Sequence, residues 1–245
     1  MYTWFQAMHT RVDILMQLSG SDARQRMEQA TEAMRSTIVA LERTANCFAP
    51  ESELSAFNRL PAGTRMELSP GLHQILTLCQ RYHALTEGLF DITVHSPNHT
   101  PSTFGQLHIA PDHTAMRGTP DLYINLSGFL KGYALDRLAT LLDEYGIHHA
   151  LVNMGNSSIM ARGDVPFHIR NACLTTSGNS PANPRHILHP VTGQYITEPV
   201  SISVVTDNGA DGEVASTAMF LATPSERMNL LTALGIRNFT INPAT

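Results

Sequence analysis

The segment from residues 122 to 145 constrains the fold more than any other part of the chain. It begins with a strand-like run at 122–124, continues through a turn of small residues, and then places apolar residues at helical spacing from Leu135 to Tyr145. A helix that starts directly after a strand leaves its first N–H groups free, and its dipole favours negative charge there. Lys131 adds a positive charge at that point. The segment therefore predicts either a phosphate-binding turn or an ordinary helix start.

Composition and charge exclude several classes of protein. A chain of 245 residues can bury a sizeable core. Its net charge of −5 and scattered basic residues argue against nucleic-acid binding. The three cysteines (Cys47, Cys79 and Cys173) form neither a disulfide framework nor a zinc pattern. Since no membrane-spanning run and no signal peptide is visible, we expect a cytoplasmic protein, or a periplasmic or membrane-anchored one if a leader has been removed.

Strand and helix periodicities are mixed along the chain, which predicts the α+β class. We expect a single domain over residues 1–245, with two closely packed subdomains as the alternative. The expected strands cover 8–18, 90–94, 150–153, 201–206 and 237–241. The expected helices cover 22–45, 70–87, 133–145, 213–222 and 225–234. The remaining long stretches, at 48–63, 95–121 and 164–200, are expected to be loops because they are rich in turn-forming residues and show no period.

A second segment with chemical potential is G-A-D-G-E-V-A-S-T at 209–217. Glu213 and Thr217 are four residues apart, so on a helix they share one face. Two hard oxygen ligands suit Mg²⁺, which completes its shell with water and phosphate oxygens. The alternative is an acidic residue in a first helical turn with a threonine behind it, which is common.

A third segment combines T-S-G at 176–178 with H-I-L-H-P-V-T-G at 186–193. A zinc site at His186 and His189 is disfavoured, because no third ligand lies nearby in the sequence. The chain also lacks a nucleophile elbow, a Walker loop and a G-x-G-x-x-G turn. These patterns alone do not select a catalytic group.

Taken in order, the short motifs resemble the FAD:protein FMN transferase family, also called the ApbE family. The resemblance runs from Met8 to about Leu234. Its marks are M-H-T at 8–10, E-S-E-L-S-A-F-N at 51–58, T-E-G-L-F-D-I-T-V at 86–94, K-G-Y-A-L-D at 131–136, L-V-N-M-G-N at 151–156, T-S-G at 176–178, H-I-L-H-P-V-T-G at 186–193 and E-V-A-S-T at 213–217.

The resemblance implies an α+β enzyme that binds FAD and Mg²⁺ and splits the FAD pyrophosphate. FMN would pass to a threonine or serine of an acceptor flavoprotein, or to water, and AMP would leave. The metal ligands would be Gly128 through its carbonyl, together with Glu213 and Thr217. The flavin-nucleotide contacts would be Met8, Phe48, Asn125, Lys131, His186 and Ile187.

Some motif positions depart from the family pattern. Glu213, Asn125 and His189 stand where the family usually has aspartate, and Asn156 stands where it has a second glycine. The loop after Val94 also lacks the family's usual tryptophan-containing segment. An alternative therefore stays open, namely a non-catalytic flavin-binding or interaction protein that keeps the fold.

Overall fold

A seven-stranded, fully antiparallel sheet forms the centre of the molecule in the computed structural model, which describes residues 1–179 and 185–243. The strands follow the order β1-β2-β6-β7-β8-β9-β10 across the sheet. Their bounds are Tyr2–Ala7 (β1), Thr10–Gln17 (β2), His149–Met154 (β6), Ser158–Arg162 (β7), Ala172–Gly178 (β8), Val200–Thr206 (β9) and Asn238–Pro243 (β10).

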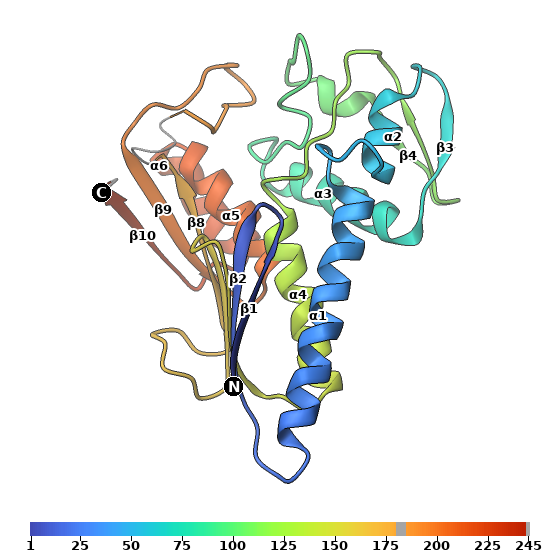
Figure 1. Ribbon diagram of the computed structural model, residues 1–245. Coiled ribbons are helices and arrows are strands. Elements are labelled where there is room, and N and C mark those ends of the chain that lie inside the picture. Colours follow the sequence, from blue (N-terminus) through green and yellow to red (C-terminus); the bar gives the residue numbers. More distant parts are fainter. Residues whose placement is uncertain (180–184, 244–245) are drawn as a thin grey trace.

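Helices cover one face of this sheet (Figure 1). The long α1 (Ala23–Ala45) packs on α4 (Leu130–Glu144), and α4 packs on α5 (Gly209–Leu221), which lies against β8 and β9. A short α6 (Pro224–Ala233) follows α5. No helix of the described residues is both long and apolar enough to cross a membrane.

Alternation in the sequence explains how the sheet meets these helices. Val12, Ile14 and Met16 on β2 are fully buried toward the helices, as the alternating pattern of residues 8–18 predicted. On α1 the apolar stripe that includes Met34 and Ile38 is also fully buried, which confirms the helix expected there. The expected α+β class is confirmed.

A smaller part lies beyond one end of α1 and α4 (Figure 1). It contains α2 (Glu53–Arg59), α3 (Pro70–Leu85) and a three-stranded sheet in the order β3-β5-β4. The three strands are Arg65–Glu67 (β3), Leu107–Ile109 (β4) and Thr114–Arg117 (β5), with a 3-10 turn at Thr103–Gln106 before β4. The buried apolar side chains of both parts join in one continuous core.

Three expectations about this smaller part were wrong. The stretch 48–63 is not all loop, because Ser52 caps α2 by accepting a hydrogen bond from the Ser55 backbone, while Leu54 and Phe57 fill the core. The stretch 95–121 contains the paired strands β4 and β5, which are too short for an alternating pattern to reveal them. Residues 90–94 form turns instead of a strand, since the Asp91 carboxylate accepts hydrogen bonds from the backbone and hydroxyl of Thr93.

Other boundaries also differ from the expectation. Residues 122–124 run extended without joining a sheet, because the Asn58 side chain bonds both the N–H and the carbonyl of Ile124. Helix α4 starts three residues earlier than expected and α5 four residues earlier. In the seven-stranded sheet, the sequence analysis did not predict β1, β7 and β8, of which β8 lies inside the presumed loop at 164–200.

Candidate functional site

A large cavity opens where the helix layer, the sheet and the smaller part converge. Its volume is about 1270 Å³. Segments that are far apart in the sequence contribute to its lining, namely parts of 89–95, 125–131, 155–157, 176–179, 186–190, 213–221 and 242–243, together with Ser201. Cavities for drug-sized ligands usually measure roughly 300–1,000 Å³, so this one has room for a larger molecule.

The cavity depends on an unusually close approach of α4 and α5. A Cβ atom added to Gly132 would lie 2.1 Å from the carbonyl oxygen of Gly209 and 2.5 Å from Cγ of Glu213. A Cβ on Gly209 would lie 2.4 Å from the carbonyl oxygen of Gly132. Only glycine at both positions allows this backbone contact. The contact brings the start of α4, which carries Lys131, beside the helix that carries Glu213.

Asp136 fixes the relative position of the two helices. Its carboxylate accepts hydrogen bonds from the backbone N–H of Gly209 (2.6 Å) and of Ala210 (2.9 Å), the first residues of α5. Burial raises the pKa of Asp136 to about 6, although the two amide donors oppose the shift. The last residue of the K-G-Y-A-L-D motif therefore caps the neighbouring helix.

A chain of polar groups connects Lys131 with Glu213 along the wall of the cavity. Nζ of Lys131 donates to the hydroxyl of Ser157, whose oxygen lies 3.4 Å from that of Ser158. Ser158 in turn donates to Oε1 of Glu213. Glu213 is 5% exposed, and burial raises the pKa of its carboxyl, while the nearby Lys131 charge, Ser158 and the Gly132 amide act in the opposite direction.

The two serines of this chain were not predicted as site residues. Ser158 is the first residue of β7, and Ser157 lies in the preceding turn, in which Asn156 has a positive φ of 62°. Their sequence signal is weak, because small polar residues after a turn are common in any hairpin.

Hydroxyl groups of β8 and α5 gather about one helical turn after Glu213. Oγ of Ser177, on β8, lies 2.8 Å from Oγ of Ser216 and 3.2 Å from Oγ1 of Thr217. Glu213, Thr217 and Gly128 all line the cavity. The described residues hold no group of three or more His, Cys, Asp or Glu side chains suited to a metal ion. One carboxylate with neutral oxygens is the kind of donor set that Mg²⁺ takes when phosphate and water supply the rest.

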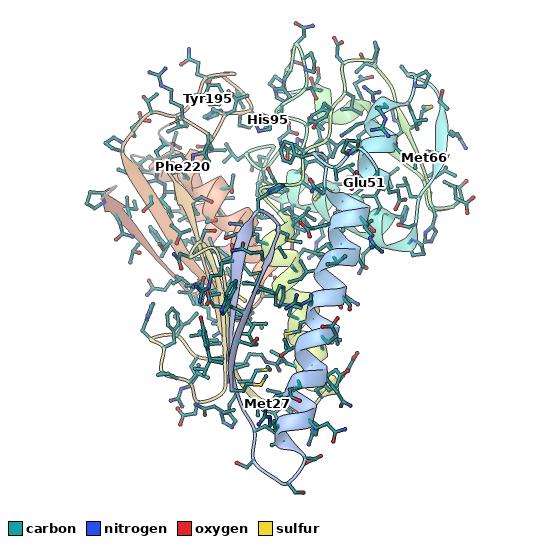
Figure 2. The ribbon with its side chains drawn as sticks, in the orientation of Figure 1. Met27, Glu51, Met66, His95, Tyr195 and Phe220 are labelled. Carbon is teal, nitrogen blue, oxygen red and sulfur yellow. The ribbon has the colours of Figure 1, made fainter. Side chains whose placement is uncertain are left out.

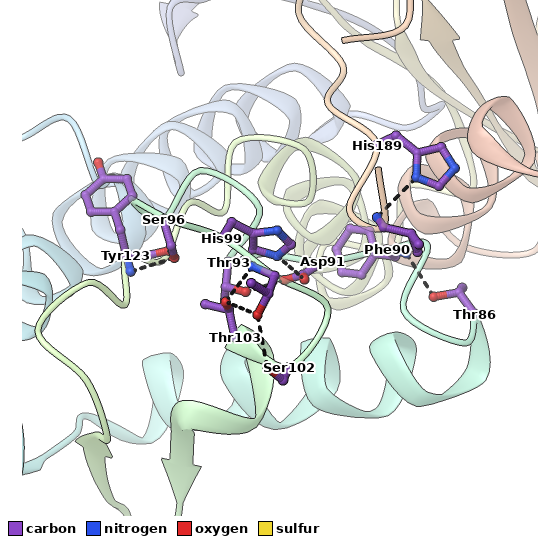
Figure 3. A network of polar contacts seen from close by, with 12 residues as sticks. Thr86, Phe90, Asp91, Thr93, Ser96, His99, Ser102, Thr103, Tyr123 and His189 are labelled. Carbon is purple, nitrogen blue, oxygen red and sulfur yellow. Dashed lines mark hydrogen bonds and ion pairs between the residues drawn. The ribbon is translucent and has the colours of Figure 1, made fainter. Parts of the chain in front are cut away.

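Another wall of the cavity comes from residues 89–95, which belong to the segment 86–103 that Figure 3 shows from close by. Asp91 lines the cavity. Its Oδ2 lies 2.9 Å from Nε2 of His99, and both side chains are nearly fully buried. Ser96 accepts from the Tyr123 backbone at 2.9 Å and thereby ties this segment to the entry of α4. These contacts stabilise a folded loop where a strand was expected at 90–94, and they hold this wall of the cavity in place.

The structure brings together seven of the nine residues predicted for the site. Those that line the cavity are Asn125, Gly128, Lys131, His186, Ile187, Glu213 and Thr217. Met8 is not among them, since it forms the β1–β2 turn and its backbone N–H donates to Glu42 at 2.8 Å. Phe48 is also absent from the lining, and 62% of its surface is exposed. A binding role for Met8 and Phe48 stays a prediction.

The first N–H groups of α5 are bound by side chains of the protein itself. Asn208 caps α5 by accepting from the Asp211 backbone, and Asp136 takes the Gly209 and Ala210 amides. Glu213 and Thr217 reach the cavity from the second and third turns of the helix.

Comparison with known proteins gives a consistent picture. A protein from Chlamydia muridarum described as FAD:protein FMN transferase is 25% identical over 242 residues, which covers 78% of this chain and 75% of that protein. The Escherichia coli K12 protein of the same description is 23% identical over 279 residues, covering 91% of this chain and 79% of its own length.

Solved structures show the same fold. The flavin transferase ApbE from Vibrio cholerae superimposes with a TM-score of 0.81 at 20% identity, covering all of this chain and 97% of that one. The ApbE protein of Thermotoga maritima gives a TM-score of 0.75 at 18% identity, covering all of this chain and 96% of that one. The sequence model of the ApbE family matches residues 8–239, nearly the whole chain. This chain therefore belongs to the ApbE family.

Proposed function

We propose that this protein transfers FMN from FAD to a threonine or serine hydroxyl of an acceptor flavoprotein, in a reaction that depends on Mg²⁺. The hydroxyl oxygen attacks the phosphorus on the FMN side of the pyrophosphate. The bond from that phosphorus to the bridging oxygen breaks, AMP leaves, and the hydroxyl proton passes to a base or to solvent. With water in place of the hydroxyl, the products are FMN and AMP.

The single observation that carries this proposal is the convergence of Lys131 and Glu213 in one cavity of about 1270 Å³. Transfer of a phosphoryl group depends mainly on positioning and on neutralising charge, and less on covalent chemistry by the protein. Lys131 is the only lysine among the 16 basic residues of the chain, and it lines this cavity. Its ammonium group suits the negative charge of a pyrophosphate.

Glu213, Thr217 and the Gly128 carbonyl would hold the metal ion, because all three offer hard oxygens to the same space. The ion would supply charge neutralisation on the pyrophosphate. Ser158 keeps the Glu213 carboxylate oriented, and Ser177 contacts the Thr217 hydroxyl at 3.2 Å. Burial raises the pKa of the Glu213 carboxyl, and a bound metal ion would favour its charged form.

Incubation with FAD and Mg²⁺ tests the proposal, with and without a protein acceptor. AMP is measured by chromatography, and covalent FMN on the acceptor by mass spectrometry. We expect AMP in both cases and flavin on the acceptor. Absence of AMP above background at saturating FAD would reject catalysis, and FAD binding without turnover would favour the non-catalytic alternative.

Matched variants locate the activity in this cavity. Lys131→Met should lower kcat/KM by about 10²–10³, since loss of one preorganised charge-stabilising group has effects of that order. Glu213→Gln should weaken Mg²⁺ binding, so that half-maximal activity needs a higher Mg²⁺ concentration, because the change removes the only charge of the donor set. Glu144→Gln, an exposed acid at the end of α4, is the control and should behave as wild type.

A further inference from the structure

A short hairpin covers one side of the cavity. Leu188 pairs with Tyr195, and the Ile196 N–H donates to the Ile187 carbonyl at 3.0 Å. The first arm, from His186 to Leu188, lines the cavity, whereas 49% of the Tyr195 surface is exposed. Figure 2 shows Tyr195 on this hairpin and His95, another cavity residue, on the loop that faces it.

Asn179, which directly follows β8, binds the second arm of this hairpin. Its side chain is 4% exposed, and Nδ2 donates to the carbonyl of Ile196 (2.9 Å) and to that of Glu198 (3.1 Å). Its backbone N–H donates to the Val200 carbonyl at 3.0 Å. Among the described residues, no other side chain from outside the hairpin donates to the backbone of residues 187–198.

Asn179 also lines the cavity itself. Its Oδ1 is buried and has no hydrogen-bond partner within the described parts of the chain. A buried acceptor without a partner is costly, so a ligand that offers an N–H or O–H group would satisfy it. The side-chain amide of Asn179 therefore binds the hairpin through Nδ2 and would bind a ligand through Oδ1.

We propose that Asn179 is a positioning residue, which fixes the hairpin over the cavity and so presents His186 and Ile187 to the flavin nucleotide. The hold on the hairpin follows from the contacts alone, while the identity of the ligand rests on the proposed function. Asparagine is required because both Nδ2 hydrogens are used. Aspartate has the same shape but would place a charged oxygen against two carbonyl oxygens.

Hydrogen exchange of the ligand-free protein tests the hold on the hairpin directly. In Asn179→Asp, the amides of His189, Gly193 and Ile196 should exchange on the order of tenfold faster than in wild type, since two hydrogen bonds are lost. Lowering the pH protonates the new aspartate and returns one donor, so this difference should shrink. Asn238→Asp, which changes an exposed asparagine on β10 in the same way, should leave these amides unchanged.

Asn179→Ala removes the donors without adding charge and serves if the aspartate variant does not fold. Wild-type exchange of the hairpin amides in a folded variant would overturn the proposal. The second readout is the steady-state reaction with FAD, in which KM should rise about tenfold or more with a smaller change in kcat. Faster hairpin exchange with unchanged KM and kcat would also overturn the positioning role. If the wild-type protein itself neither binds nor turns over FAD, the proposed function fails, and hydrogen exchange alone then decides whether Asn179 holds the hairpin.

Discussion

The contact between α4 and α5 at Gly132 gives a prediction that links stability to the site. In Gly132→Ala, the new methyl group would lie 2.1 Å from the Gly209 carbonyl oxygen and 2.5 Å from Cγ of Glu213. Real carbon–oxygen contacts are more than 3 Å long, and a backbone carbonyl in a helix cannot move aside alone. The two helices must therefore separate, and Glu213 must shift with them.

The expected magnitude follows from two opposing terms. Forcing a methyl group into a tightly packed interface costs typically about 1–3 kcal/mol, and more where backbone atoms are in the way. Replacing glycine with alanine inside a helix returns about 0.5–1 kcal/mol. The net loss in the free energy of unfolding should be about 1–2 kcal/mol. For a chain of this length, that loss lowers Tm by roughly 2–8 °C.

Urea unfolding followed by circular dichroism measures this loss as a lower midpoint with an unchanged slope. The control is Gly71→Ala, because Gly71 is exposed on α3 and an added Cβ would meet only Oγ of Ser69 at 4.0 Å. That variant should be as stable as wild type or slightly more stable. If Gly132→Ala unfolds at the same midpoint as wild type, the helices are not in the contact described, and the route by which Glu213 reaches the cavity is wrong.

Four further predictions follow from single contacts. The pKa of Asp136 is raised to about 6, so the native state binds this proton more tightly than the unfolded state. The free energy of unfolding should therefore decrease as the pH rises from about 4 to about 6, and Asp136→Asn should lack that slope in urea titrations. Asp91→Ala leaves the buried His99 ring and the Thr93 N–H without their acceptor and should cost about 1–3 kcal/mol, seen as a lower urea midpoint. Thr223→Ala removes the capping box of α6 and should cost about 1 kcal/mol without changing FAD turnover. An amine-selective reagent should modify Lys131 and the N-terminus, and mass spectrometry should show that FAD protects Lys131; equal labelling with FAD would contradict its place in the site.

The elements that could be predicted from the sequence are those with a long period or a clear cap. The stripe of α1 runs over 23 residues, and Ser69 followed by Pro70 marks the start of α3, so both helices are found close to their expected bounds. Strands of three or four residues, such as β4 and β5, are too short to show a period. β5 pairs with β4 on one side and, on the other, with β3, which is distant in the sequence.

The candidate site was predictable in part for a related reason. Lys131 and Glu213 stand in motifs whose order along the chain resembles the ApbE family, and the structure places both in the cavity. Ser158 and Asn179 have no such signal, because their importance comes from partners 55 and 17 or 19 residues away. A local pattern does not contain information about contacts of that kind.

The two helix starts differ in a way that decides where a pyrophosphate would lie. Helix α5 is capped twice at its first residues, by Asn208 and by Asp136, so its amides and dipole are already satisfied within the protein. Helix α4 has no side-chain cap at Phe129, and its start lines the cavity with Lys131 in the first turn. The dipole at a helix start and the charge of a nearby lysine both favour anions, although the Leu130 N–H already donates to the Leu126 carbonyl. We therefore expect the phosphates on the α4 side, between Lys131 and Gly128. Glu213, in the middle of α5, would act on the same phosphate charge through the metal ion that it is proposed to hold.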